Sequence, residues 1–245
     1  MTGFTYTSDT TLAQRATLGL IVLKADETIE LDFRRLLPAD VALHVSRIDS
    51  DADVTPQSLI KMKDRLTASA NLFADASQFD CVGYACTSGT TIIGQAEVAK
   101  RVHAGCTTKA VTTPVDALFA ACKHLGAKRI AILSPYVADV SDALRALLKT
   151  HAIETTAFGS FNQSSEAAVV RIDTASIINA ATALCADAEI DALFISCTNL
   201  RTLDAIPVVE KAIGKPVLTS NTVLAWHMLQ VAGVGLKTDR VGHLI

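Results

Sequence analysis

The sequence lacks a long apolar run, an excess of basic residues and a basic, apolar leader. Its apolar stretches, such as residues 18–23, are far shorter than the roughly 20 residues that cross a bilayer. The first eleven residues are polar and Thr-rich, unlike a secretory signal. With 22 basic and 25 acidic residues, the chain has no electrostatic footprint for nucleic acid. We therefore expect a cytoplasmic protein with neither membrane nor nucleic-acid partners.

The six cysteines lack the spacing of a metal site, because no two of them form a CxxC motif and the six histidines are scattered. Without a signal peptide, reduced thiols are expected rather than disulfides. A G-x-G-x-x-G motif and a P-loop are also missing, so we expect neither a metal nor a cofactor. Free cysteines are usually small buried apolar residues, and we assign this role to four of them: Cys81, Cys106, Cys122 and Cys185.

Half of the residues are hydrophobic, and they gather in short runs rich in β-branched side chains. Continuous apolarity is typical of parallel strands that are covered on both faces. Helical patterns lie between these runs; one begins at Thr113–Pro114 and ends at Gly126. The alternation predicts an α/β fold of the doubly wound kind. The predicted strands are 18–23, 41–46, 79–85, 109–112, 129–133, 193–196 and 216–219.

Two segments of the chain resemble each other. Residues 79–88 and 190–199 both start with an apolar residue and Asp, continue as an apolar run and end in Cys-Thr followed by a small polar residue. The two cysteines, Cys86 and Cys197, are 197 − 86 = 111 residues apart. A repeat at nearly half the chain length predicts two similar lobes related by a pseudo-twofold axis.

Both repeated segments place a cysteine where an apolar strand ends, which is where open parallel sheets bind ligands. Backbone N–H groups and the hydroxyls of Thr87, Ser88 and Thr198 suit a carboxylate. The same donors lower a thiol pKa, and the thiolate is the reactive form. Two facing thiols, Cys86 and Cys197, permit proton removal on one side of a substrate and return on the other, or nucleophilic attack by one with help from the other.

Other cysteine chemistries differ in how well they fit. A phosphatase loop requires Arg six residues after the cysteine, but these positions hold Ile92 and Leu203. The glycines of a nucleophile elbow are also missing. A Cys-His hydrolase stays open, because its histidine can be distant in sequence.

The chain resembles the aspartate/glutamate racemase superfamily, and within it the maleate isomerase and arylmalonate decarboxylase branch, including relatives from ectoine utilisation. The resemblance implies two lobes, each with a mainly parallel four-stranded sheet, and an active site between them. We place one lobe at 15–112 plus 220–245 and the other at 113–219. The segments that carry the resemblance are 19–22 (GLIV), 26–30 (DETIE), 85–88 (ACTS), 134–137 (SPYV), 161–162 (FN) and 196–207 (SCTNLRTLDAIP).

The resemblance also implies residue roles. Cys86 matches the cysteine that attacks the alkene carbon in maleate isomerases, and Cys197 matches the one that assists by proton transfer. Decarboxylases of this branch have Gly at the first position, so the presence of both cysteines disfavours decarboxylation. The remaining matches are to residues that hold the substrate's carboxylates: Thr87, Ser88, Thr198 and Tyr136 for one, and Asn162 for the other.

Asp26 departs from the family pattern, because maleate isomerases have Asn there. Two like charges about 4 Å apart repel by roughly 4 kcal/mol at an effective dielectric near 20. An ionised Asp26 therefore disfavours a second substrate carboxylate, unless Lys24 or a proton compensates, and favours an ammonium or hydroxyl group. Asp26 also suits a helix cap, a role that is compatible with substrate contact.

The sequence thus predicts a cofactor-independent two-cysteine isomerase of a small carboxylic acid, similar to maleate cis–trans isomerase. The first alternative is an amino-acid racemase that uses two-base proton transfer. An arylmalonate-type decarboxylase, a cysteine lyase or hydrolase, and a non-enzymatic carboxylate-binding module stay open. An apolar, lightly charged chain favours a homo-oligomer, either a dimer or larger.

Overall fold

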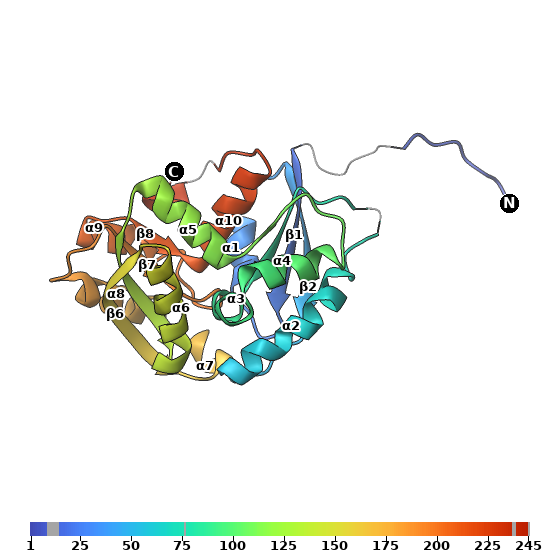
Figure 1. Cartoon of the computed structure of the whole chain (residues 1–245). Helices are drawn as coiled ribbons and strands as arrows, with labels where there is room; N and C mark the ends of the chain where they lie inside the picture. Colours follow the sequence, from blue (N-terminus) through green and yellow to red (C-terminus); the bar gives the residue numbers. More distant parts are fainter. Residues whose placement is uncertain (9–14, 76, 237–238, 245) are drawn as a thin grey trace.

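A computed structural model describes residues 1–8, 15–75, 77–236 and 239–244. The chain forms two four-stranded parallel sheets that lie next to each other (Figure 1). The first sheet has the order β2-β1-β3-β4 and the second the order β6-β5-β7-β8. Their strands are β1 (Ala16–Leu23), β2 (Val41–Ile48), β3 (Cys81–Ala85), β4 (Val111–Thr112), β5 (Arg129–Tyr136), β6 (Glu154–Gln163), β7 (Ala192–Ile195) and β8 (Val217–Thr219).

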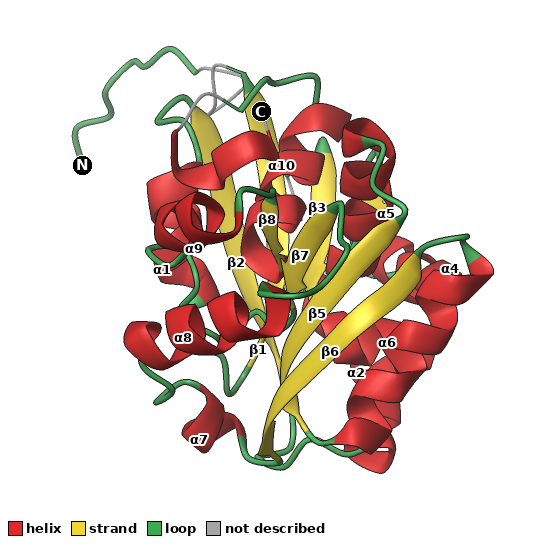
Figure 2. Cartoon of the chain, turned by 90° about the vertical axis from the view of Figure 1, so that its left-hand side faces the viewer, coloured by secondary structure: helices red, strands yellow, loops and turns green. Residues whose placement is uncertain are grey.

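Helices connect the strands and cover both faces of the sheets; α8 and α9 lie on one side of the second sheet and α6 on the other (Figure 2). The helices are α1 (Ile29–Leu36), α2 (Pro56–Ala70), α3 (Thr87–Ile93), α4 (Gln95–His103), α5 (Pro114–Leu125), α6 (Ala138–Thr150), α7 (Glu166–Val169), α8 (Thr174–Cys185), α9 (Ile206–Ile213), α10 (Ser220–Val231) and the 3-10 helix η1 (Asp239–Leu244). None of the helices in the described ranges is long and apolar enough to cross a membrane.

The α/β class with two parallel sheets is confirmed, and both sheets follow the same order of strands. In each sheet a candidate cysteine follows one of the two inner strands, β3 or β7. β3 pairs with Leu18–Val22 of the other inner strand, β1, and β7 pairs with Ile130–Leu133 of β5. Equivalent strand ends therefore present Cys86 and Cys197. Helix α10 packs against β3 of the first sheet and against α5. The lobe boundaries stated for the sequence remain a prediction.

Local sequence signals explain several element ends. The Thr113 hydroxyl accepts a hydrogen bond from the Asp116 amide at 3.2 Å, which caps α5, and Gly126 ends this helix in the left-handed conformation with φ 67°. The strand β6 was missing from the predicted set. It lies at the edge of its sheet, and its residues are exposed or half-buried, so it lacks the continuous apolarity of the central strands.

The core consists of the apolar runs that predicted the strands. All five residues of β3 and all four of β7 are buried. None of the six cysteines forms a disulfide. Cys81, Cys122 and Cys185 are buried and Cys106 is half-buried, so these four pack in or beside the core. Burial raises the pKa of Cys81 and Cys122 to about 12, which keeps both in the unreactive thiol form.

Candidate active site

Both candidate cysteines line one small pocket between the ends of the strands of the two sheets. The pocket encloses about 10 Å³, which is room for about one water molecule. A substrate therefore requires the surrounding side chains to move apart. The lining residues are Leu23, Asp26, Cys86, Thr87, Ser88, Tyr136, Glu166, Cys197, Thr198 and Asn199.

Cys86 is the N-cap of α3, and its Sγ accepts a hydrogen bond from the Gly89 amide at 3.1 Å. The side chain is 6% exposed. Burial, the largest cause, raises the pKa of Cys86 to about 12; the Gly89 amide opposes this shift and the charge of Glu166 adds to it. The lowered pKa that the sequence predicted for the Cys86 thiol is therefore wrong, because desolvation outweighs the backbone donors.

Cys197 follows β7 in a strained backbone conformation, with φ 110°. Its amide donates to Ser220 Oγ at 2.9 Å, which holds the turn in place. Its Sγ accepts from the Asn199 amide at 3.3 Å and lies 3.0 Å from the Tyr136 hydroxyl. Burial and the Glu166 charge raise the pKa of Cys197 well above the usual thiol value. Both thiols thus carry their protons until something accepts them.

Asp26 both caps a helix and faces the pocket. Its Oδ1 accepts from the amides of Thr28 and Ile29, each at 2.8 Å, at the start of α1. Its Oδ2 is buried and has no hydrogen-bond partner in the described structure. The Thr198 side chain is near enough to lower the pKa of Asp26, but its hydroxyl donates to the Ala85 carbonyl at 3.3 Å. Burial, the dominant cause, raises the pKa of Asp26.

The cations near Asp26 point elsewhere. Lys24, considered above as a compensating charge, is an exposed side chain that pairs with Asp49 at 3.3 Å. Arg47 donates to the Asp26 carbonyl oxygen at 3.0 Å and forms an ion pair with Glu30. Its charge lowers the pKa of Asp26, but this is the smallest of the causes. The free Oδ2 is therefore available to a donor from a ligand.

Glu166, the first residue of α7, is a pocket residue that the sequence did not indicate. It is 5% exposed. Its Oε1 accepts from the Tyr136 hydroxyl at 2.8 Å, and its Oε2 accepts from Asn199 Nδ2 at 2.9 Å. Burial raises the pKa of Glu166, and the charge of Asp26 adds to this shift. Glu166 follows a polar stretch and begins a helix of only four residues, so its sequence context resembles an ordinary helix start.

The other predicted site residues divide into two groups. Thr87, Ser88, Tyr136 and Thr198 line the pocket. Asn162 does not: it is exposed on β6 with φ 54°, and its amide donates to Ser160 Oγ at 2.9 Å. The structure therefore brings together every predicted site residue except Asn162, and it places Glu166 and Asn199 in the pocket as well.

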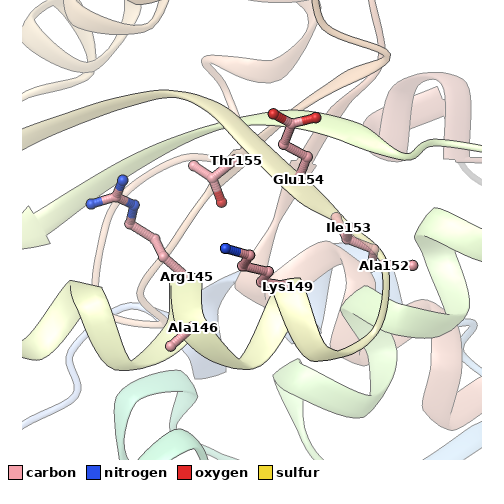
Figure 3. A pocket seen from close by; sticks show the side chains of 7 residues that line it. All are labelled: Arg145, Ala146, Lys149, Ala152, Ile153, Glu154 and Thr155. Atoms are coloured by element: carbon pink, nitrogen blue, oxygen red, sulfur yellow. The ribbon is translucent and has the colours of Figure 1, made fainter.

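A larger cavity lies away from the cysteines, between α6 and the start of β6 (Figure 3). It has a volume of about 570 Å³ and contains no thiol. No group of three or more His, Cys, Asp or Glu side chains in the described ranges is arranged to hold a metal ion. The residues around the larger cavity are Arg145, Ala146, Lys149, Ala152, Ile153, Glu154 and Thr155.

Comparison with known proteins gives one family. Residues 94–245, more than half of the chain, match the family model described as arylmalonate decarboxylase. The arylmalonate decarboxylase of Bordetella bronchiseptica is 34% identical over 131 residues, which cover 51% of this chain and 53% of that protein. The match thus spans about half the length of this relative. The maleate isomerase of Nocardia farcinica is 25% identical over 240 residues, or 93% of this chain and 94% of that protein.

A solved structure shares the fold. It is a cysteine-to-alanine variant of the maleate isomerase Iso from Pseudomonas putida S16 with maleate. It superimposes with a TM-score of 0.84 at 24% identity, over 94% of this chain and 96% of that one. The pair of four-stranded sheets is therefore an architecture that both chains adopt.

Proposed function

The chain belongs to the arylmalonate decarboxylase family, and from this premise we propose that it is a cofactor-independent isomerase of a small carboxylic acid, with Cys86 and Cys197 as its catalytic residues. The observation that carries the proposal is that two thiols, on equivalent strand ends of two sheets, line the same small pocket. A single nucleophile does not need a second cysteine in the same place, whereas proton transfer to and from one carbon needs an acid and a base.

In the proposed reaction, one thiolate removes the proton from the carbon next to the substrate carboxylate, and the other thiol donates its proton to that carbon from the opposite side. The first sulfur gains a proton and the second loses one. A catalytic turnover in the reverse direction restores the starting protonation state of both thiols. The amides of Thr87 and Ser88, which have no acceptor inside α3, are suited to hold the carboxylate and the negative charge that spreads onto it.

The charges of the pocket favour a substrate that also carries nitrogen. Asp26 Oδ2 is buried without a partner, and an unpaired buried acceptor costs about 1–3 kcal/mol. An ammonium or amide N–H next to the carboxylate would supply the missing donor. A second carboxylate would instead meet Asp26 and Glu166, both buried in the same pocket. We therefore propose amino-acid racemisation or epimerisation as the reaction.

Cis–trans isomerisation of maleate is the second candidate. It is supported by the similarity to a maleate isomerase over 93% of the chain and by the presence of both cysteines. It requires a protonated Asp26 and Glu166, and burial raises the pKa of both carboxyls in that direction. Here Cys86 would add to the alkene carbon, rotation would follow, and Cys197 would transfer the proton.

Proton NMR in D2O distinguishes these reactions with one panel of compounds: aspartate, glutamate, diaminobutyrate, maleate, 2-methylmaleate and phenylmalonate. Racemisation replaces the α proton of an amino acid by deuterium and yields the opposite enantiomer. Maleate isomerisation yields fumarate, and decarboxylation yields a monocarboxylate from phenylmalonate. We expect exchange with an amino acid. The absence of change in every compound would contradict this choice of substrate class.

A further inference from the structure

The thiol of Cys197 needs a proton acceptor, and its surroundings contain one route to a carboxylate. The Tyr136 hydroxyl lies between Cys197 Sγ, at 3.0 Å, and Glu166 Oε1, at 2.8 Å. All three side chains are buried, with exposed fractions of 4% for Cys197, 4% for Tyr136 and 5% for Glu166. The three groups form an unbroken chain of hydrogen bonds that bulk water does not interrupt.

The direction of these hydrogen bonds sets the direction of proton flow. The single proton of the Tyr136 hydroxyl is donated to Glu166. The Tyr136 oxygen then faces Cys197 as an acceptor, so the contact at 3.0 Å is filled by the thiol proton. Each proton thus already points toward the group that would receive it.

We propose that Glu166 is the proton acceptor for Cys197 and acts through the Tyr136 hydroxyl. The S–H bond of Cys197 breaks as its proton bonds to the Tyr136 oxygen, and the original tyrosine proton bonds to Glu166 Oε1. The products are a Cys197 thiolate, an unchanged tyrosine hydroxyl and a neutral Glu166. No proton enters or leaves the pocket, and no other reactant is needed.

Neighbouring groups support this transfer. The Asn199 amide, 3.3 Å from Cys197 Sγ, can stabilise the new thiolate, and Asn199 Nδ2 holds Glu166 Oε2 at 2.9 Å. Asp26 faces the same space and its charge favours the neutral form of Glu166. Burial acts in the same direction by raising the pKa of Glu166. Cys86 is the remaining titratable group of the pocket.

Cys86 has no equivalent route. Its Sγ accepts from the Gly89 amide at 3.1 Å, and the nearby Tyr84 hydroxyl donates to the Met62 sulfur at 3.5 Å rather than to a carboxylate. The two thiols therefore differ: Cys197 becomes the base and Cys86 starts as the acid. The order of these roles rests on the proposed function, whereas the proton transfer from Cys197 to Glu166 does not.

The transfer makes a prediction about pH that needs no substrate. The thiolate–carboxylic acid form and the thiol–carboxylate form contain the same number of protons, so their ratio does not change with pH. The amount of Cys197 thiolate should therefore stay constant between the pKa of Glu166 beside the neutral thiol and its higher pKa beside the thiolate, whose charge disfavours the carboxylate. An isolated thiol instead gains about tenfold in thiolate per pH unit below its pKa.

Hydrogen peroxide tests this prediction, because it oxidises thiolates and is close to water in size. Oxidation of Cys197 is followed against pH by mass spectrometry of peptides, in a Cys86→Ser background. We expect a plateau in the wild-type Cys197 rate and a rise of about tenfold per pH unit in Glu166→Gln. Tyr136→Phe keeps the Glu166 charge but lacks the hydroxyl between the two groups, so we expect a shorter plateau in this variant. The half-buried Cys106 reports the response of an ordinary thiol in the same samples. Glu189→Gln, at an exposed ion pair with Arg129, should keep the plateau.

The shape of the pH profile, rather than the rate at one pH, reports proton acceptance by Glu166. The Glu166 charge raises the pKa of Cys197, so Cys197 in Glu166→Gln should react faster than in the wild type at pH values above the start of the plateau. A steady rise of about tenfold per pH unit in the wild type, a plateau that survives in Glu166→Gln, or an unreactive wild-type Cys197 beside a reactive Cys106 would each overturn the proposal. None of these results depends on which compound is the substrate.

Discussion

Ser220 Oγ accepts a hydrogen bond from the amide of Cys197 at 2.9 Å. The same oxygen lies 2.8 Å from the hydroxyl of Thr87, so one side chain at the start of α10 connects the two cysteine turns. Ser220 is fully buried. Ser220 thus stabilises the strained backbone of Cys197, which has φ 110°. It does so from α10, the helix that follows β8.

Ser220→Ala should therefore weaken both the turn and the fold. The change leaves the Cys197 amide and the Thr87 hydroxyl without this partner, at a cost of about 1–3 kcal/mol in the free energy of unfolding. We also expect turnover to fall, because Cys197 loses its fixed position. Denaturant unfolding and kinetic assays measure the two effects. Ser46→Ala removes a buried hydroxyl that bonds the Ser69 carbonyl outside the pocket, and should lower stability without lowering turnover per folded molecule.

Gly89→Ala should displace the Cys86 thiol. A Cβ atom at Gly89 would lie 2.8 Å from Cys86 Sγ and 2.7 Å from the Tyr84 hydroxyl, which is closer than carbon atoms pack. We expect the rate constant for turnover to fall by at least about tenfold, as for a misplaced catalytic group. Gly83→Ala is the matched control, since its Cβ would meet the flexible Met228 side chain at 2.6 Å. Equal activity losses in the two variants would argue against a specific effect on Cys86.

Asp26→Asn should change which substrates the pocket accepts. The Asn side chain keeps an oxygen that accepts from the backbone N–H groups of Thr28 and Ile29, but it lacks the charge that would pair with an ammonium group. We expect weaker binding of an amino-acid substrate, by about tenfold or more, and better binding of maleate. Isothermal titration with both ligands measures this exchange. Unchanged affinities for both would reduce Asp26 to a helix cap.

Asp32→Asn should stabilise the protein near neutral pH. Burial raises the pKa of Asp32 to about 6, although the hydrogen bond from Asn221 and the charge of Arg35 both act to lower this pKa. Because this pKa lies above the unfolded value, the stabilising contribution of Asp32 is full below about pH 4 and is lost as pH rises through about 6. This shift in the pKa of Asp32 corresponds to about 3 kcal/mol in the free energy of unfolding. An Asn at position 32 can still accept from Asn221 Nδ2 and does not ionise.

Unfolding measured from about pH 4 to 8 should show this loss of stability in the wild type and much less of it in Asp32→Asn. Asp187→Asn, at an exposed position, should follow the wild-type curve. If Asp32→Asn follows the wild-type curve as well, Asp32 is not the group responsible.

The sequence allowed the fold class and most pocket residues to be predicted, because their signals are local. Apolar runs mark the buried strands, and the repeated Cys-Thr turns mark equivalent strand ends. Ser220 and Glu166 were not found, because they belong to no repeated motif and act only through contacts with distant segments. Ser220 contacts Thr87 across 133 positions, and Glu166 contacts Asn199 across 33. No spacing rule relates such residues before the sheets bring them together.

Asn162 and Glu166 illustrate a second limit. They are four residues apart, but Asn162 lies on the exposed edge strand β6, and the chain then turns so that α7 presents Glu166 to the pocket. The thiol pKa values show a third limit. Donors can be inferred from the sequence, whereas the full burial that raises the pKa of Cys86 to about 12 depends on how closely the two sheets approach.

Deuterium exchange at the α carbon of an amino-acid substrate in D2O, followed by NMR for the wild type, Cys86→Ala and Cys197→Ala, tests the two-thiol mechanism most directly. We predict exchange with racemisation in the wild type, and a loss of racemisation by about 10²–10⁴-fold or more in each single variant, because each lacks the acid or the base on one side of the carbon. Racemisation at wild-type rates in both variants would contradict the assignment of Cys86 and Cys197 as the catalytic pair.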